Sequence, residues 1–190
     1  KYMGQTDSQR KLPCNPSFSY TLPHLTSTVQ LSCIEAAADR WESLPCHTMT
    51  LSSSAQQRFL THLASIKARY AYQGGFLVQS GNNFPKSMGI ASSASSFAAL
   101  TRCALQALSD LSATQLPSLQ EQARISRQGS GSSCRSFYAP WCLWEDDRTY
   151  AIEIPYTTLL HQLVLCDRTE KTVSSSEAHR RVCTSPFFEK

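Results

Sequence analysis

The chain has 190 residues, of which 41% are hydrophobic, enough for one large domain or for one domain with part of a second. Its formal net charge is only +4 and its basic residues form no run, which favours small anionic ligands over nucleic acid. No apolar stretch has membrane-spanning length and none has the form of a signal peptide, so we expect no membrane partner and a cytoplasmic location.

The eight cysteines contain no CxxC pair, and the five histidines form no metal-binding motif. Cys33 and Cys166 fall in strand-like apolar runs, and Cys103 lies in a predicted helix. We therefore expect free, buried cysteines in a reducing compartment rather than disulfides.

In the first half of the chain, residues 11–19 predict a turn-rich loop, and the alternation over residues 26–34 predicts a half-buried strand. Residues 35–53 are expected to be a polar connection. Apolar residues at helical spacing predict a helix over 54–70, and Phe76-Leu77-Val78 begins a strand.

In the second half, helices are predicted over residues 92–111 and from Pro117 to near Gly129. Strands are predicted at 141–145, 149–154 and 162–167, and Asp146-Asp147 is expected to be a solvated hairpin turn. A helix is predicted to start at 173–177, with Ser174 and Glu177 as a capping box. This irregular mixture predicts an α+β fold.

Pro85–Leu100 combines a glycine turn, a serine cluster and the start of an apolar helix. Free N–H groups and the helix dipole favour a phosphate at such a helix start, although serines there are also ordinary helix caps.

The segment Ile125–Ser136 repeats the pattern with two glycines, several serines and Arg135, whose guanidinium binds carboxylate or phosphate. A flexible Gly/Ser connection is the alternative interpretation of this segment. Lys171, before Ser174–Ser176, is a third candidate phosphate contact or a surface residue.

Five ordered segments together resemble the mevalonate diphosphate decarboxylases, a family of the GHMP small-molecule kinase superfamily. These segments are Lys1–Gly4, Leu12–Ser17, Asn82–Leu100, Ser126–Ser136, and Lys171–Ser175 with the later Thr184-Ser185-Pro186. The resemblance implies the GHMP N-terminal domain, of the ribosomal protein S5 domain 2-like type, over residues 1–157, with residues 158–190 beginning a second α+β domain. It also implies an ATP- and Mg²⁺-dependent carboxy-lyase of isoprenoid biosynthesis that converts 5-diphosphomevalonate to isopentenyl diphosphate, and a homodimer for the full-length family.

The same resemblance implies roles for individual residues. Arg135, Asn15 and Lys1 would act at the reacting centre, with Arg135 orienting the carboxylate that leaves as carbon dioxide. Substrate would be bound by Tyr2, Ser130, Gly131, Ser132, Arg135, Lys171, Ser174 and Ser175. ATP would be bound by Asn83, Pro85, Gly89, Ala91, Ser92 and Ser93, the last two also near the magnesium ion.

The sequence departs from the family pattern in four ways. Gln5 replaces a lysine expected near the substrate phosphates, Met3 replaces a tryptophan, and Ser95-Ser96 replaces two small residues. The family's D-A-G-P-N segment, which carries its catalytic aspartate, does not occur. We therefore expect an incomplete decarboxylase, lacking the first strand and most of the second domain and inactive alone. A related mevalonate-type kinase that does not decarboxylate, or a non-catalytic remnant that binds a ligand or partner, are the alternatives.

Overall fold

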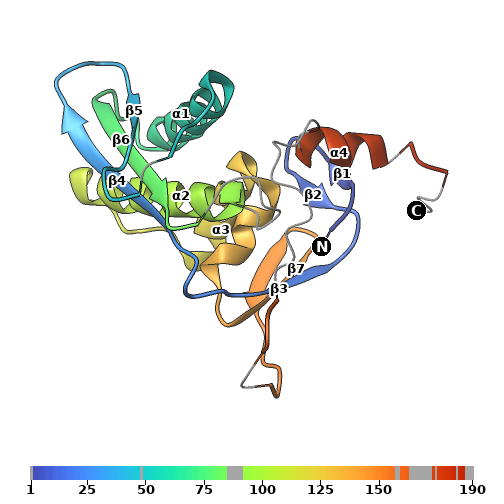
Figure 1. Ribbon diagram of the computed structural model, residues 1–190. Helices are drawn as coiled ribbons and strands as arrows, with labels where there is room; N and C mark the ends of the chain where they lie inside the picture. The colour runs from blue at the N-terminus through green and yellow to red at the C-terminus, as the bar shows by residue number, and fades with distance from the viewer. Residues whose placement is uncertain are drawn as a thin grey trace.

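The structure is a computed structural model that describes residues 2–47, 49–84, 92–156, 159–162, 173, 175–182 and 184–186. Helices and short strands alternate irregularly along this part of the chain (Figure 1). In chain order the elements are β1 Gln5–Asp7, β2 Leu12–Pro13, β3 Ser17–Tyr20, β4 Ser27–Ile34, β5 Arg40–Ser43, α1 Ser53–Arg69, β6 Gly75–Asn82, α2 Ser92–Leu111, α3 Leu119–Gly129, the 3-10 helix η1 Gly131–Phe137, β7 Trp141–Glu145, β8 Arg148–Ala151 and α4 Ser175–Val182. The α+β prediction is confirmed.

The described strands form three small sheets. In the first, β6 is central, antiparallel to β4 from Ser27↔Asn82 to Ile34↔Gly75 and parallel to β5. In the second, β7 is central and antiparallel to both β3 and β8. The third is the short antiparallel pair β1–β2 near the N-terminus. The chain passes directly from β3 to β4, so the two larger sheets are linked beside α2 (Figure 1).

The main core lies where α1 and α2 pack together and against β4 and β6. Its buried side chains come from α1, β6, α2 and α3 and include Leu63, Val78, Leu100 and Leu105, each with no exposed surface. The apolar side chains of both helices recur at helical spacing, so burying one face of each removes a continuous apolar stripe from water. Ser52 caps α1 by accepting a hydrogen bond from the Ala55 amide at 3.3 Å.

A second, smaller core lies between α3, η1 and β7. It contains Tyr2, Ala123, Cys134 and Trp144, and the rings of Tyr2 and Trp144 meet edge to face at 4.7 Å. On its other side Tyr2 stacks on His179 of α4 at 4.3 Å, and His179 Nδ1 accepts a hydrogen bond from the Gly4 amide at 3.1 Å. The N-terminal segment is thus fixed between α4 and the rest of the fold.

The predicted helices over 54–70, 92–111 and 117–129 and the strands at 26–34, 76–78, 141–145 and 149–154 are confirmed within a few residues. The predictions for two loop segments were wrong. The polar connection over 35–53 contains β5, and the loop over 11–19 contains β2 and the start of β3. These strands have two to four residues, too few to show an alternating pattern, and their pairing depends on partners distant in sequence.

The turn at Asp146-Asp147 was also misjudged. It does join β7 and β8, but the Asp147 carboxylate is paired with Arg10, Arg124 and the fully buried Arg127 rather than solvated.

Free thiols are present, as predicted, at Cys33, Cys46, Cys103, Cys134 and Cys142, but of these only Cys134 and Cys142 are buried. Cys33 and Cys46 are exposed. The predicted strand at 162–167 and the capping residue Ser174 lie almost wholly outside the described residues, while the helix expected near 173–177 is α4. Among the helices of the described segments, none is long and apolar enough to cross a membrane.

Candidate functional site

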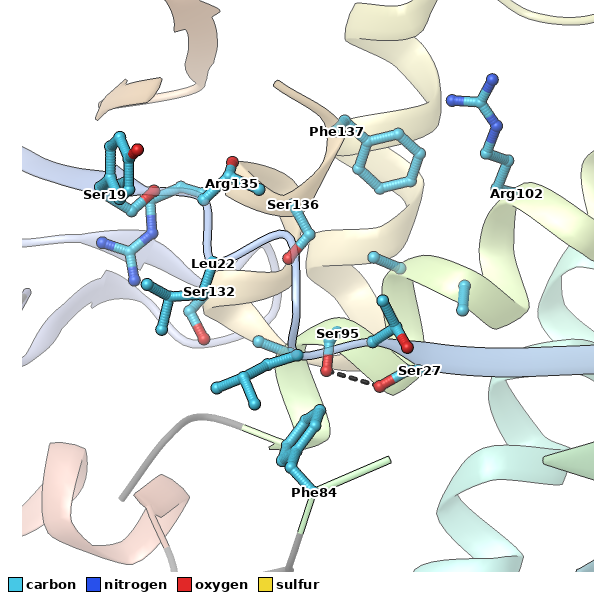
Figure 2. Close-up of a pocket in the computed structure, with 17 residues that line it drawn as sticks. Ser19, Leu22, Ser27, Phe84, Ser95, Arg102, Ser132, Arg135, Ser136 and Phe137 are labelled. Carbon is cyan, nitrogen blue, oxygen red and sulfur yellow. Dashed lines mark hydrogen bonds between the residues drawn. The ribbon is translucent and has the colours of Figure 1, made fainter. Parts of the chain in front are cut away.

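A cavity of about 390 Å³ lies between the loop after β3, the N-terminal half of α2, and η1 (Figure 2). Its size is within the range of small-molecule sites. Serine side chains line it from each side: Ser19 of β3 and Ser27 of β4, which flank the loop, Ser95 of α2, and Ser132 and Ser136 of η1. Two arginines, Arg102 and Arg135, also line it, and of the described lining residues none is acidic. The cavity therefore offers hydrogen-bond donors and positive charge, which suits an anion.

One wall of the cavity is formed where β4, β6 and α2 meet. Ser27 Oγ donates to Asn82 Oδ1 at 2.6 Å, and Ser27 Oγ and Ser95 Oγ lie 2.7 Å apart (Figure 2). Ser96 Oγ donates to the same Asn82 oxygen at 3.2 Å. Asn82, at the end of β6, thus fixes the first turns of α2 relative to the sheet. Ser92 and Ser93 are the first two residues of α2, where the backbone N–H groups have no partner within the helix.

The opposite wall is the segment that follows α3. The helix ends at Gly129, and the chain continues through Ser130 into η1 rather than into a flexible connection. Ser126 Oγ donates to Ser133 Oγ at 2.7 Å, and Ser133 Oγ donates to the Ser130 carbonyl at 2.6 Å. Both serines are fully buried. These hydroxyls fix the turn from within, and Ser132 and Arg135, on the same turn, line the cavity.

Arg135 has the most distinctive environment in the site. Its Nη1 donates to Ser17 Oγ on β3, and its guanidinium carbon lies 6.0 Å from the Trp144 ring centroid. Burial lowers the pKa of Arg135 from its usual value. Its Nε is buried without a hydrogen-bond partner among the described residues. An unpaired buried donor is costly, so an acceptor brought to this N–H by a bound ligand would be stabilising.

Tyr2 approaches the turn from outside. A Cβ added at Gly131 would lie 2.4 Å from the Tyr2 hydroxyl oxygen and 3.7 Å from Gln5 Nε2, so glycine is required for this close approach. Burial raises the pKa of Tyr2, and the phenol therefore stays neutral. Tyr2 and Gly131 were both predicted substrate-site residues, and they lie together, although neither lines the cavity directly.

The two predicted asparagines make contacts that hold loops in place. Asn15 Oδ1 accepts the Met3 amide at 3.0 Å, and its Nδ2 donates to the Pro16 carbonyl at 2.8 Å. Asn83 Oδ1 accepts the Thr26 amide at 2.8 Å and its Nδ2 donates to the His24 carbonyl at 2.8 Å. Neither lines the cavity; Asn83 fixes the loop that does, next to Thr26.

Several predicted site residues lie outside the described residues. They are Lys1, Pro85, Gly89, Ala91, Lys171 and Ser174. Ser175 begins α4, and only its backbone is described. The residues missed by sequence reasoning are Ser19, Ser27, Ser95, Arg102 and Ser136. Ser95 and Ser136 lie within the two serine-rich segments, and Arg102 interrupts an apolar helix. Ser19 follows the Leu12–Ser17 segment by two residues, whereas nothing near Ser27 indicates a site.

No group of three or more histidine, cysteine or carboxylate side chains that could hold a metal ion occurs in the described part of the chain. A magnesium ion here would take most of its ligands from water and phosphate oxygens, as Mg²⁺ commonly does in nucleotide sites. The hydroxyls of Ser92 and Ser93 are suitable oxygen donors for such an ion.

The sequence and the fold are similar to those of known proteins. The family described as "Diphosphomevalonate decarboxylase-like N-terminal domain" matches residues 1–152. Diphosphomevalonate decarboxylase mvd1 of Aspergillus fumigatus is 36% identical over 161 residues, covering 76% of this chain and 38% of that protein.

Two solved structures are similar over most of the chain. The mevalonate diphosphate decarboxylase from Legionella pneumophila is 53% identical with a TM-score of 0.89, covering 99% of this chain and 61% of that one. The mevalonate diphosphate decarboxylase from Enterococcus faecalis, studied for mevalonate diphosphate mediated ATP binding, is 26% identical with a TM-score of 0.68, covering 82% of this chain and 47% of that one.

The chain thus spans between about two fifths and three fifths of the length of these relatives. The GHMP-type α+β fold predicted from the motifs is confirmed by the structural matches. Because the family match covers most of the chain and includes both serine-rich segments, this chain belongs to the diphosphomevalonate decarboxylase-like N-terminal domain family.

Proposed function

We propose that this chain forms the ligand-binding part of an ATP-dependent diphosphomevalonate decarboxylase and that the described cavity receives diphosphomevalonate. The observation that carries the proposal is the buried, unpaired Nε of Arg135 in the cavity wall. A guanidinium whose Nη1 is held by Ser17 presents its remaining donors in a fixed plane, which suits a bidentate carboxylate.

The charge of the cavity supports an anionic ligand. Arg102 and Arg135 contribute positive charge, and the serine hydroxyls supply neutral donors that adapt to phosphate oxygens. Of the described residues that line the cavity, none would repel such a ligand with a carboxylate. Oriented donors of this kind stabilise the charge that develops during phosphoryl transfer and decarboxylation.

ATP is assigned to the N-terminus of α2. The open N–H groups of its first turn and the hydroxyls of Ser92 and Ser93 favour phosphate oxygens, and Asn82 holds this turn through Ser96. Mg²⁺ would be bound between those phosphates and the same hydroxyls. Its chemistry is to neutralise the phosphate charges, while the chain orients the two ligands toward each other.

The remaining assignments follow from the same family membership. Arg135 orients the departing carboxylate, and Tyr2, Ser130, Gly131 and Ser132 form the substrate side of the site together with Lys171, Ser174 and Ser175. We assign residues 1–157 to the N-terminal domain and 158–190 to the start of a second one. The homodimer, the cytoplasmic location and the inactivity of the chain in isolation stay predictions.

The test is calorimetric titration of the purified chain with diphosphomevalonate. Arg135→Gln is expected to weaken binding at least tenfold, because a charge-assisted hydrogen bond contributes about 1.5–3 kcal/mol. Arg148→Gln is the matched control, since Arg148 is exposed on β8 and does not line the cavity. Equal affinity of Arg135→Gln and wild type would remove Arg135 from the site.

The reaction itself is tested in a longer form of the protein, supplied with diphosphomevalonate, ATP and Mg²⁺. ADP and carbon dioxide released together support decarboxylation. ADP released without carbon dioxide would support the kinase alternative instead. Binding without either product would support a non-catalytic protein.

A further inference from the structure

The turn that forms the substrate side of the cavity has an external support that the motifs do not include. Lys11, at the end of the loop between β1 and β2, donates from Nζ to the carbonyl oxygen of Gly129 at 2.9 Å. Gly129 is the last residue of α3, and Ser130, Gly131 and Ser132 follow it directly. The lysine therefore contacts the chain one residue before the cavity turn begins.

Gly129 is closely surrounded by neighbouring atoms at this contact. A Cβ added at Gly129 would lie 2.3 Å from Phe97 Cδ1 and 2.9 Å from His62 Cγ, so the glycine is enclosed on that side by α1 and α2. One residue before Lys11, the Arg10 carbonyl accepts a hydrogen bond from Arg127 Nε at 3.0 Å. The β1–β2 loop is thus hydrogen-bonded to the last turn of α3 at two consecutive residues, Arg10 and Lys11.

Lys11 itself is held in an uncommon conformation. Its φ of 52° is in the left-handed region, which lysine rarely adopts because its Cβ crowds the backbone. From this position the side chain reaches the C-terminal end of α3.

The hydrogen-bond acceptor of the Lys11 ammonium group is a backbone carbonyl rather than a carboxylate. Burial, with the positive charge of Arg58 as the second cause, lowers the pKa of Lys11 to about 8. Among the hydrogen bonds of the described residues, Lys11 donates to no carboxylate. Its acceptor is the Gly129 carbonyl at the C-terminal end of α3, where the helix dipole favours a cation.

The surrounding charged and titratable groups come from each neighbouring element. They are Arg58 and His62 on α1, Arg124 and Arg127 on α3, Asp147 in the β7–β8 turn, and Arg10 and Asp7 beside Lys11 in its own loop. The Asp147 carboxylate is paired with Arg10, Arg124 and Arg127.

We propose that Lys11 is a positioning residue, which holds the Gly129–Ser132 turn in its ligand-binding form through the Gly129 carbonyl. The proposal rests on the proposed function in one respect: the ligand of that turn is taken to be diphosphomevalonate. When Lys11 loses its proton, the charge–dipole attraction is lost and only a weaker neutral hydrogen bond remains. The turn is then held less firmly, and ligand affinity falls.

The first experiment needs no ligand. Amide hydrogen exchange at Ser130 and Ser133, whose N–H groups donate to Ser126 and Ser130 carbonyls, reports on the turn directly. At pH 7, Lys11→Met is expected to accelerate exchange at both amides at least about threefold, and Lys11→Arg to restore it. Val78 in the buried centre of β6 is the reference amide. Lys11→Met is expected to fold, because it removes a buried charge and keeps the length of the side chain.

The second experiment follows the affinity of the chain for diphosphomevalonate from pH 7 to 9.5. Wild-type affinity is expected to fall several-fold through about pH 8, and Lys11→Met to be weak and flat over this range. Arg58→Gln removes the neighbouring positive charge without touching Gly129, so it is expected to move the midpoint to higher pH. A merely structural lysine would not produce this shift.

Unchanged exchange in Lys11→Met would overturn the proposal, as would a pH midpoint that Arg58→Gln leaves in place. If the wild-type chain shows the expected exchange pattern but no affinity for diphosphomevalonate, the positioning role stands and the proposed function fails.

Discussion

Replacing Asp147 with asparagine removes one negative charge from the centre of an arginine cluster. The carboxylate binds Arg10 at 2.9 Å, Arg124, and Arg127, whose side chain is only 2% exposed. These contacts join the β7–β8 turn to α3 and to the loop before β2. We expect Asp147→Asn to destabilise the fold mainly by leaving the Arg127 charge buried without a counter-ion.

The magnitude follows from the exposure of each partner. Arg10 and Arg124 are about half exposed, so each of their contacts contributes about 0.5 kcal/mol. Breaking a buried pair costs about 3–5 kcal/mol. We take the lower end for Arg127, because Asp147 is 25% exposed and Arg127 keeps two contacts to backbone carbonyls. Asparagine preserves one acceptor oxygen, so the expected total is about 3 kcal/mol, or a fall in Tm of about 6–12 °C for a chain of this size.

The assay is urea unfolding followed by circular dichroism, with Asp146→Asn as the matched control. Asp146 is the preceding turn residue, with φ 48°, a conformation that asparagine tolerates, and its side chain is outside the arginine cluster. Its substitution is expected to change stability by less than about 0.5 kcal/mol. If Asp147→Asn were equally mild, the cluster would not support the fold.

The pH dependence supplies an independent check. Hydrogen bonds from Arg124 and the charge of Arg127 hold the pKa of Asp147 well below its usual range. The folded state therefore favours the ionised carboxylate, and the stabilisation is present above the ordinary pKa near 4 and is lost as pH falls below it. Asp147→Asn is expected to lack this part of the acid-induced loss.

Three further predictions concern Gly131 and His62. Gly131→Ala is expected to destabilise the chain by about 1–3 kcal/mol, because the new methyl group would lie 2.4 Å from the Tyr2 hydroxyl oxygen. Urea unfolding tests this, and Tyr2→Phe is expected to recover much of the loss, because it removes that oxygen and leaves the nearest ring carbon at 3.3 Å. Burial lowers the pKa of His62 to about 4, so the fold favours the neutral ring and loses up to about 3 kcal/mol of stability as pH falls from 6.5 to 4. Since Thr101 Oγ1 already donates to the Phe97 carbonyl, His62 donates from Nε2, and a nitrogen NMR spectrum showing protonation at Nδ1 alone would contradict this.

The helices were predictable from sequence because their information is local. Phe97, Leu100, Ala104, Leu105 and Leu108 recur on one face of α2, and that face is the one that is buried. β5 was not predictable, since four residues with one inward-pointing tryptophan carry no period and its parallel partner β6 lies beyond α1.

In the site, too, residues within a local motif were predictable, and residues brought together by distant packing were not. Ser132 and Arg135 were predicted because they belong to a long local motif, and the cavity contains both. Ser27 lies in an ordinary strand, and only the pairing of β4 with β6 and the packing of α2 place it beside Ser95. Lys11 contacts Gly129 across 118 residues, and Asp147 contacts Arg10 across 137, so neither partnership has a signal in local sequence.

The hydrogen bond that the Arg135 Nε–H is proposed to donate to the ligand can be observed directly. The Nε–H signal of Arg135 is assigned in a ¹⁵N NMR spectrum by its disappearance in Arg135→Lys, and the chain is then titrated with diphosphomevalonate. We expect a saturable shift of this signal as the carboxylate or a phosphate oxygen of the ligand accepts the hydrogen bond. A signal that stays in place while the ligand binds elsewhere on the chain would contradict it.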